Sequence, residues 1–312
     1  MSQLKVACIF GTRPELIKMA PVIHALQADP QCFKVETICT GQHKELLIPL
    51  VEWFKLRIDR NLDVMRAGQG LNELTGRLMT EFGKLFAEVH YDCVIGQGDT
   101  TSVFAAAFAA FHEKIPFVHV EAGLRTFDRD LPFPEEMNRV LVGRLASLHF
   151  APTESAAENL RKEGILESNL FMVGNTAIDA LRYTVRNIEN PAKSSNTDKK
   201  LILVTAHRRE NFGEPLQRIC KAIRHLAEKS DNLEFVFPVH PNPNVRSLVF
   251  EALGGLDNVH LIDPAPYEQL VAYLQRSHLV LTDSGGIQEE APALGKPVLV
   301  LREETERLNS LH

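Results

Sequence analysis

Short apolar runs alternate along the chain with segments whose apolar residues recur at helical spacing. Residues 4–10 and 117–120 show the first pattern, and residues 71–89 show the second. Near-continuous apolar runs of this length are typical of strands buried on both faces of a parallel sheet, and the segments between them supply the crossover helices. The alternation predicts strands at residues 4–10, 34–40, 93–96, 117–120, 148–151, 170–173, 201–205, 235–239, 259–262, 279–281 and 298–301.

One polar segment interrupts this alternation. Residues 187–200 (NIENPAKSSNTDKK) carry serine, proline and lysine without apolar periodicity, as a loop near a domain boundary does. A chain of 312 residues is also long enough to bury two cores. We therefore predict an α/β protein with two doubly wound Rossmann-like domains, residues 1–172 and 173–312. Such sheets bind ligands beyond the carboxyl ends of their strands, so we expect a cleft between the two domains.

Composition and charge narrow the class of protein. With 45% hydrophobic and 24% charged residues the chain resembles an ordinary globular protein, and its net charge of −6 provides no global positive field for nucleic acid or a membrane. No apolar run reaches the roughly 20 residues that span a bilayer, and the N-terminal run lacks a signal peptide's cleavage pattern. The five cysteines have neither metal-ligand nor disulfide spacing. These features predict a cytoplasmic protein without nucleic-acid or membrane partners.

Polar and charged side chains follow seven of the predicted strands. The turn after residues 279–281 contains Ser284, Gly285 and Gly286, which would present backbone N–H groups and a hydroxyl at a helix start, with Glu290 about one helical turn later. This pattern suits a phosphate with an attached ribose, although an ordinary βαβ turn also explains it. The other strand ends carry Arg13 and Lys18, Gln42 and His43, Asp99, Glu121, His207 and Arg208, and His240.

Most of these residues have a purely structural explanation when each is taken alone. Asp99 could cap the helix predicted from residue 102, and Glu135, which begins another helix, favours the helix dipole. His207 and His240 could be hydrogen-bonded histidines at a sheet edge. Glu121 ends an apolar strand, where an unpaired carboxylate is costly. Their shared position at strand ends favours one site that holds a diphosphate and performs acid–base chemistry on a neutral polyol, as a nucleotide sugar requires.

Motifs for several other chemistries are missing. GTRPE follows the first strand where a nicotinamide site would have GxGxxG, and the chain has no GxxxxGK[ST] phosphate loop. It has neither HExxH nor paired-ligand spacing, and no GxSxG nucleophile elbow. The sequence therefore predicts no cofactor and no catalytic metal.

A series of motifs extends over nearly the whole chain. They are, in order, FGTRPE, GQH, GQGDTTS, HVEAGLRT, PFPEEMNR, GNTAIDAL, TAHRRENFG, VHPNP and TDSGGIQEEAPALGKPVLVLR. The set resembles the bacterial non-hydrolysing UDP-N-acetylglucosamine 2-epimerases, which share the two-domain GT-B glycosyltransferase fold. The resemblance implies reversible conversion to UDP-N-acetylmannosamine, by elimination of UDP to 2-acetamidoglucal and re-addition, for cell-surface polysaccharide synthesis. It also implies a homodimer and a second, activating UDP-N-acetylglucosamine site.

The resemblance also assigns roles to individual residues. Acid–base catalysis falls on Asp99, Glu121, Glu135 and His207. Binding of UDP and the sugar falls on Arg13, Arg139, Asn175, Arg208, Ser284, Gly285, Gly286 and Glu290, with Glu290 on the ribose. The activator site falls on Lys18, Gln42, His43 and His240.

The resemblance is lost at Leu308, where the family has proline. The chain ends four residues later, so it resembles a truncated or frame-shifted relative without the family's last βα unit and final helix. We expect this to affect stability, domain closure and dimerisation, whereas every residue assigned above is present. Three other functions remain open at this point: a GT-B glycosyltransferase, a hydrolysing epimerase, and a nucleotide-sugar-binding protein without activity.

Overall fold

A computed structural model describes residues 3–41, 44–66, 68–188, 199–206 and 211–302. By its contacts the chain divides into two compact units, Met1–Ala180 and Leu181–His312. The domain boundary predicted from the sequence at residues 172/173 stays a prediction. Within the described part of the chain, no helix combines the length and apolar character needed to cross a membrane.

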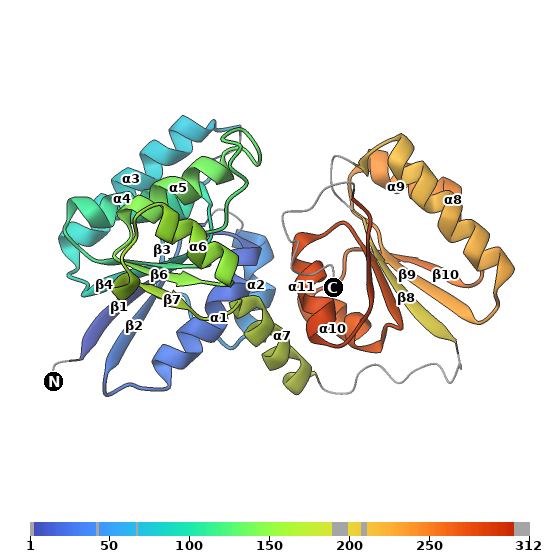
Figure 1. The fold of residues 1–312 in the computed structure, drawn as a ribbon, viewed down its shortest axis with the longest axis horizontal. Helices are drawn as coiled ribbons and strands as arrows, with labels where there is room; N and C mark the ends of the chain where they lie inside the picture. The colour runs from blue at the N-terminus through green and yellow to red at the C-terminus, as the bar shows by residue number, and fades with distance from the viewer. Residues whose placement is uncertain (1–2, 42–43, 67, 189–198, 207–210, 303–312) are drawn as a thin grey trace. The chain divides into compact units, whose positions relative to one another are not determined.

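The first unit is built on a seven-stranded parallel sheet. Its order is β3-β2-β1-β4-β5-β6-β7, so the strands on either side of β1 are β2 and β4 (Figure 1). Most of the buried residues of this sheet are apolar; Val6 to Phe10 of β1, for example, are all buried. The strands are β1 (Leu4–Phe10), β2 (Phe33–Cys39), β3 (Arg60–Asn61), β4 (Cys93–Gln97), β5 (Phe117–Val120), β6 (Leu148–Ala151) and β7 (Leu170–Met172).

Helices cover both faces of this sheet. The helices α3, α4 and α5 lie together on one side of the sheet, and α1 and α2 lie on the other (Figure 1). The alanine-rich α4 packs between α3 and α5 with most of its residues buried, since small side chains allow close approach. The helices are α1 (Arg13–Gln27), α2 (Lys44–Trp53), α3 (Leu71–Glu88), α4 (Thr101–His112), α5 (Glu135–Leu145) and α6 (Glu154–Lys162), with a 3-10 turn at Glu167–Asn169. The next helix, α7 (Thr176–Asn187), begins in the first unit and ends in the second.

The second unit is a smaller version of the same plan. Its five parallel strands have the order β10-β9-β8-β11-β12. One core lies between the sheet and the helices α8 and α9, and another lies between the sheet and α10 and α11 (Figure 1). The elements are β8 (Lys200–Thr205), α8 (Glu214–Lys229), β9 (Leu233–Pro238), α9 (Pro243–Leu253), β10 (Val259–Ile262), α10 (Tyr267–Arg276), β11 (Leu279–Thr282), α11 (Gly285–Ala293) and β12 (Val298–Val300).

The predicted fold class of two doubly wound α/β domains is confirmed, and all the predicted strands are present to within two residues at either end. The one strand missed is β3, because two polar residues give no apolar signal. Both sheets reverse their strand order once, between β1 and β4 in the first unit and between β8 and β11 in the second. At such a switch point the turns after two central strands diverge to opposite faces and leave a crevice for a ligand.

Candidate active site

The turns after β1 and β4 are tied together by Glu15 at the switch point of the first sheet. Glu15 Oε2 accepts hydrogen bonds from the backbone N–H groups of Gly11 (2.7 Å) and Thr12 (2.6 Å), and Oε1 accepts one from Thr100 Oγ1 (2.5 Å). Burial raises the pKa of this carboxyl, although the same hydrogen bonds oppose the shift. Glu15 is absent from the residues predicted from the sequence; the T-x-x-E spacing of a capping box, Thr12 to Glu15, could have identified it.

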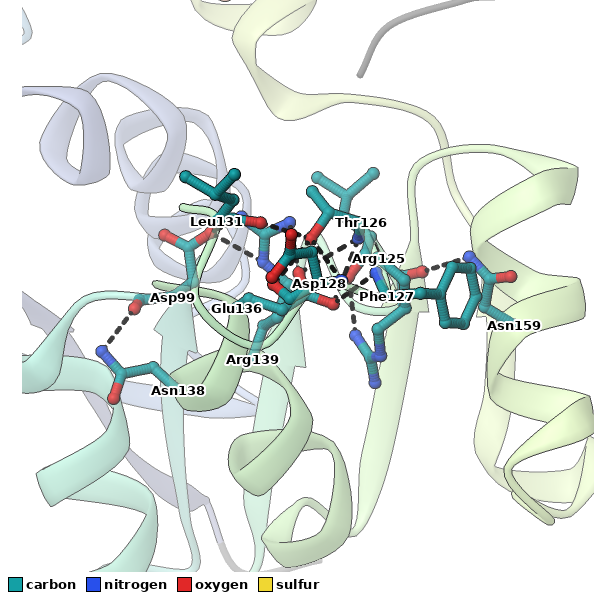
Figure 2. Close-up of polar contacts among 12 residues, drawn as sticks. Asp99, Arg125, Thr126, Phe127, Asp128, Leu131, Glu136, Asn138, Arg139 and Asn159 are labelled. Carbon is teal, nitrogen blue, oxygen red and sulfur yellow. Dashed lines mark hydrogen bonds and ion pairs between the residues drawn. The ribbon is translucent and has the colours of Figure 1, made fainter. Parts of the chain in front are cut away.

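Asp99 lies in the turn after β4 and is held by α5. Arg139 donates from Nε (3.1 Å) and Nη2 (2.5 Å) to Asp99 Oδ2, and Asn138 Nδ2 donates to the Asp99 carbonyl (2.9 Å) (Figure 2). Burial raises the pKa of Asp99, with Arg139 opposing this shift and Glu121 adding to it. The alternative role of Asp99 as a helix cap is wrong. Thr100 caps α4 instead, and its hydroxyl accepts from the Val103 N–H (3.3 Å).

Glu121 follows β5, the neighbour of β4, and pairs with Lys18 of α1. The Lys18 ammonium lies 2.7 Å and 2.6 Å from the two Glu121 oxygens, and Gln97 Nε2 donates to one of them (2.5 Å). Glu121 has a φ of 62°, a left-handed conformation that costs a residue other than glycine about 1–3 kcal/mol. The structure thus brings Lys18, assigned by resemblance to the activator site, against a residue assigned to catalysis.

The first turn of α5 carries two glutamates in different environments. Glu135 begins the helix and is half-buried, whereas Glu136 is buried and accepts hydrogen bonds from the Thr126 and Phe127 N–H groups (Figure 2). Glu136 also pairs with Arg139 at 3.3 Å. The sequence predicted Glu135 as a site residue but not Glu136. Two adjacent acids of the same type differ only in their tertiary packing, which the sequence does not show.

In the second unit, the predicted phosphate turn lies at the start of α11. Ser284 is the N-cap and Gly285 the first helical residue, and Glu290, on the same helix, is buried. The turn is braced by Thr282 Oγ1, which accepts from the Ser284 N–H (2.9 Å), and by Asn211 Nδ2, which donates to Asp283 Oδ2 (2.9 Å). The backbone N–H groups of this helix start therefore lie in a turn held by side-chain hydrogen bonds, which suits anion binding.

The remaining candidates are more scattered. Asn175 Oδ1 accepts from the Ala177 N–H (2.9 Å) at the start of α7, and His240 Nδ1 accepts from the Asn242 N–H (3.2 Å). Arg13 is half-buried in the first turn of α1. Four further predicted site residues lie outside the described part of the chain: Gln42, His43, His207 and Arg208. The structure thus brings together Lys18, Asp99, Glu121 and Arg139 within the first unit.

The sequence model of a family described as UDP-N-acetylglucosamine 2-epimerase matches residues 24–312. The chain belongs to this family. The UDP-N-acetylglucosamine 2-epimerase of Yersinia pestis is 48% identical over 314 residues, which cover 97% of this chain and 83% of that protein. Family membership confirms the resemblance carried by the motifs.

Solved structures agree with this assignment. The Neisseria meningitidis UDP-GlcNAc 2-epimerase bound to UDP-GlcNAc is 44% identical, with a TM-score of 0.90 over 99% of this chain and 85% of that chain. The structure of S. aureus MnaA with UDP is 43% identical, with a TM-score of 0.87 over 98% of this chain and 82% of that chain. The two Rossmann-like domains are those of the GT-B type, as predicted from the sequence.

His119 belongs to β5 and is buried behind the turn that carries Asp99. Its Nε2 lies 2.8 Å from the Gly98 carbonyl oxygen, so this nitrogen carries the proton and donates. Burial lowers the pKa of His119 to about 4, and His149 on the neighbouring strand and Arg125 act in the same direction. The imidazole is therefore neutral at physiological pH and fixes the backbone of the turn that carries Asp99.

From about pH 7.5 to about pH 5, the wild-type chain is expected to lose about 2 kcal/mol more unfolding free energy than His119→Gln. The pKa of His119 falls from 6.5 to about 4 on folding, so between these values the unfolded chain binds more protons and stability decreases as the pH falls. The glutamine keeps an N–H donor and does not titrate. Urea unfolding followed by fluorescence of the single tryptophan, Trp53 in the same unit, measures both curves. Parallel pH dependences would contradict this expectation.

Proposed function

We propose that this chain interconverts UDP-N-acetylglucosamine and UDP-N-acetylmannosamine by non-hydrolysing epimerisation at C2. Its family membership over residues 24–312 supports the substrate and the reaction. The observation that carries the proposal is the cluster at the first switch point, where two carboxylates, Asp99 and Glu121, lie against two cations, Arg139 and Lys18. Paired acids with different partners suit a reaction that removes a proton and returns one.

The proposed reaction removes UDP and re-adds it. One carboxylate takes the C2 proton while the C1–O bond breaks, which gives 2-acetamidoglucal and UDP; UDP then re-adds at C1 while C2 receives a proton on the opposite face. We assign these proton transfers to Asp99, Glu121 and Glu135, with His207 assisting. Burial raises the pKa of Asp99, which favours its holding a proton. Because C2–H is weakly acidic, loss of UDP must run ahead of proton removal, and cations that stabilise the departing diphosphate lower the barrier.

We assign UDP binding to the start of α11. Ser284, Gly285 and Gly286 would donate backbone N–H groups to the diphosphate, and Glu290 would accept hydrogen bonds from the ribose hydroxyls. Arg13, Arg139, Asn175 and Arg208 complete the proposed binding set. The braced turn supports the assignment, because a rigid helix start binds an anion without a cost for ordering it.

Glu290→Gln is expected to weaken UDP binding about tenfold or more, because a hydrogen bond to a charged group contributes roughly 1.5–3 kcal/mol. Glu289→Gln, on the same helix, is the matched control and should bind UDP as the wild type does. Isothermal titration of UDP into the three proteins measures the difference. Equal dissociation constants for all three would remove Glu290 from the ribose site.

The finer partner assignments rest on the family resemblance. We propose a homodimer, a cytoplasmic location, and an activating UDP-N-acetylglucosamine molecule near Gln42, His43 and His240. The contact between Lys18 and Glu121 leads us to place Lys18 in the catalytic cluster.

Chromatography of the products tests the proposed function. Incubation with UDP-N-acetylglucosamine should give a mixture with UDP-N-acetylmannosamine, and the same mixture should form from either sugar nucleotide. Free N-acetylmannosamine with UDP would indicate a hydrolysing epimerase instead. An unchanged substrate with saturable UDP binding would indicate a binding protein, and consumption only with a sugar acceptor would indicate a glycosyltransferase.

A further inference from the structure

Glu136 joins the loop at residues 126–127 to Arg139, whose guanidinium holds Asp99. Its side chain is only 3% exposed. Both of its oxygens accept from the Thr126 N–H at 3.1 Å, Oε1 also accepts from the Phe127 N–H at 3.1 Å, and Arg139 Nη1 lies 3.3 Å from Oε2 (Figure 2). One buried carboxylate thus contacts two backbone groups and one cation.

Arg139 is held by two carboxylates. Glu136 contacts Nη1, while Asp99 Oδ2 accepts from Nε and Nη2. Because a guanidinium is planar and its donors have fixed directions, two carboxylates that contact different nitrogens determine its orientation. The orientation of Arg139 against Asp99 is therefore set partly by Glu136, a residue of the same helix one turn earlier.

The contacts of Asp99 are one-sided. Within the described part of the chain, both side-chain hydrogen bonds go to Oδ2, and the side chain is 28% exposed. Asn138 holds the backbone carbonyl of the same residue. With its backbone and one oxygen fixed from α5, Asp99 offers its other oxygen, Oδ1, in a defined direction.

We propose that Glu136 is a positioning residue for the epimerisation, which orients Arg139 so that Asp99 presents Oδ1 to the substrate. This inference rests on the proposed function for the role of Asp99. In this proposal Glu136 does not contact the substrate. The two adjacent glutamates have different roles: Glu135 takes part in the proposed proton transfers, whereas Glu136 acts through Arg139 and Asp99.

The same Glu136 carboxylate also holds the loop at residues 126–127. Phe127 has a φ of 63° and is 76% exposed, and Thr126 Oγ1 donates to the Leu131 carbonyl (2.5 Å). An exposed aromatic residue in a left-handed conformation persists only where other contacts determine the backbone, and here the Glu136 carboxylate supplies them. A change at Glu136 therefore acts on the loop and on Asp99 together.

Glu136→Gln is the test variant and Glu163→Gln its matched control. Glutamine can still accept from the loop N–H groups, but it removes the charge that holds Arg139. Glu163 also holds a buried arginine of the same unit, accepting from Arg125 Nε (2.7 Å) and Nη2 (2.9 Å). Because Glu163 makes no contact with Asp99 or Arg139 among the described contacts, its variant controls for the general effect of removing a buried ion pair.

The first readout does not depend on activity. Hydrogen exchange of Arg139 Nε–H, followed by nitrogen NMR and assigned with Arg139→Lys, should be about tenfold faster or more in Glu136→Gln, because the guanidinium loses one of the two charged carboxylate contacts that hold it. It should be unchanged in Glu163→Gln. Wild-type exchange in Glu136→Gln would overturn the proposal. If the wild-type enzyme shows no turnover, the proposed function fails and this exchange rate still decides the positioning role.

The second readout is turnover. Glu136→Gln should lower kcat about 10²-fold, the effect expected of a misplaced catalytic group. In an Asp99→Asn background it should cause no further loss, because both changes affect one group. A full additional loss there, or an equal loss in Glu163→Gln, would overturn the proposal. Should Glu136→Gln not fold, Arg139→Lys, which replaces the planar guanidinium and its fixed donor directions by a single nitrogen, is expected to show the same kcat loss and the same lack of additivity with Asp99→Asn.

Discussion

Asp99→Asn is expected to slow epimerisation about 10²–10⁴-fold, the usual contribution of a general acid or base. Asparagine keeps the shape of the side chain and can accept from Arg139, but it neither takes nor returns a proton. UDP binding should stay near wild type, because the proposed UDP turn belongs to α11 in the second unit. Initial rates with UDP-N-acetylglucosamine and titration with UDP measure the two properties separately.

Two further variants serve as comparisons for Asp99→Asn. Glu121→Gln is expected to behave in the same way, since it replaces the second carboxylate of the cluster and leaves Lys18 without its ion pair. Asp130→Asn changes an exposed acid of the same unit and should turn over as the wild type does. Wild-type turnover in Asp99→Asn would remove Asp99 from the proton chemistry and with it the mechanism proposed for the cluster.

Gly123→Ala is expected to destabilise the first unit by about 3 kcal/mol or more, through steric overlap and backbone strain together. A Cβ at this position would lie 2.2 Å from the Ala156 carbonyl oxygen, and the φ of +89° is one that side chains rarely adopt. Gly123 comes two residues after Glu121, where the chain turns close to α6. The carbonyl of Gly123 also accepts from Asn159 Nδ2 (3.0 Å), so the strain reaches the packing of that helix.

Gly164→Ala separates the two contributions. Gly164 has a φ of +85°, but a Cβ added there would have no atom within 4 Å beyond its immediate chain neighbours. This variant should therefore lose only the roughly 1–2 kcal/mol of a left-handed alanine. Urea unfolding followed by Trp53 fluorescence compares the variants with the wild type. Equal losses for both glycines would show that the close approach to Ala156 does not matter.

The sequence could predict the fold and the location of the site because both depend on local pattern. Buried parallel strands such as β1 and β4 are continuous apolar runs, and the residues after them lie at the carboxyl ends of the strands in any doubly wound sheet. Asp99 and Glu121 could therefore be placed at one edge of a sheet from the sequence alone. The order of strands adds that the Asp99 turn flanks the switch point and that Glu121 follows the next strand.

The partners of these residues could not be predicted, since they depend on side-chain packing between distant elements. Lys18 comes from α1 and Glu121 from the turn after β5, and no spacing in the sequence relates them. Glu136 and Glu135 are identical in type and adjacent, yet only Glu136 is buried against the 126–127 backbone. Glu15 was overlooked because a capping box normally stabilises one helix, whereas here the same carboxylate also holds Thr100.

The central claim is that the chain breaks and re-forms the C2–H bond of a UDP-sugar without releasing the sugar. Incubation of the wild-type protein with UDP-N-acetylglucosamine in deuterated water, followed by mass spectrometry and proton NMR of the recovered material, tests it directly. We expect deuterium at C2 of both UDP-N-acetylglucosamine and UDP-N-acetylmannosamine, with no free sugar. Recovery of undeuterated UDP-sugar by a chain that binds UDP, or release of free N-acetylmannosamine, would contradict the claim.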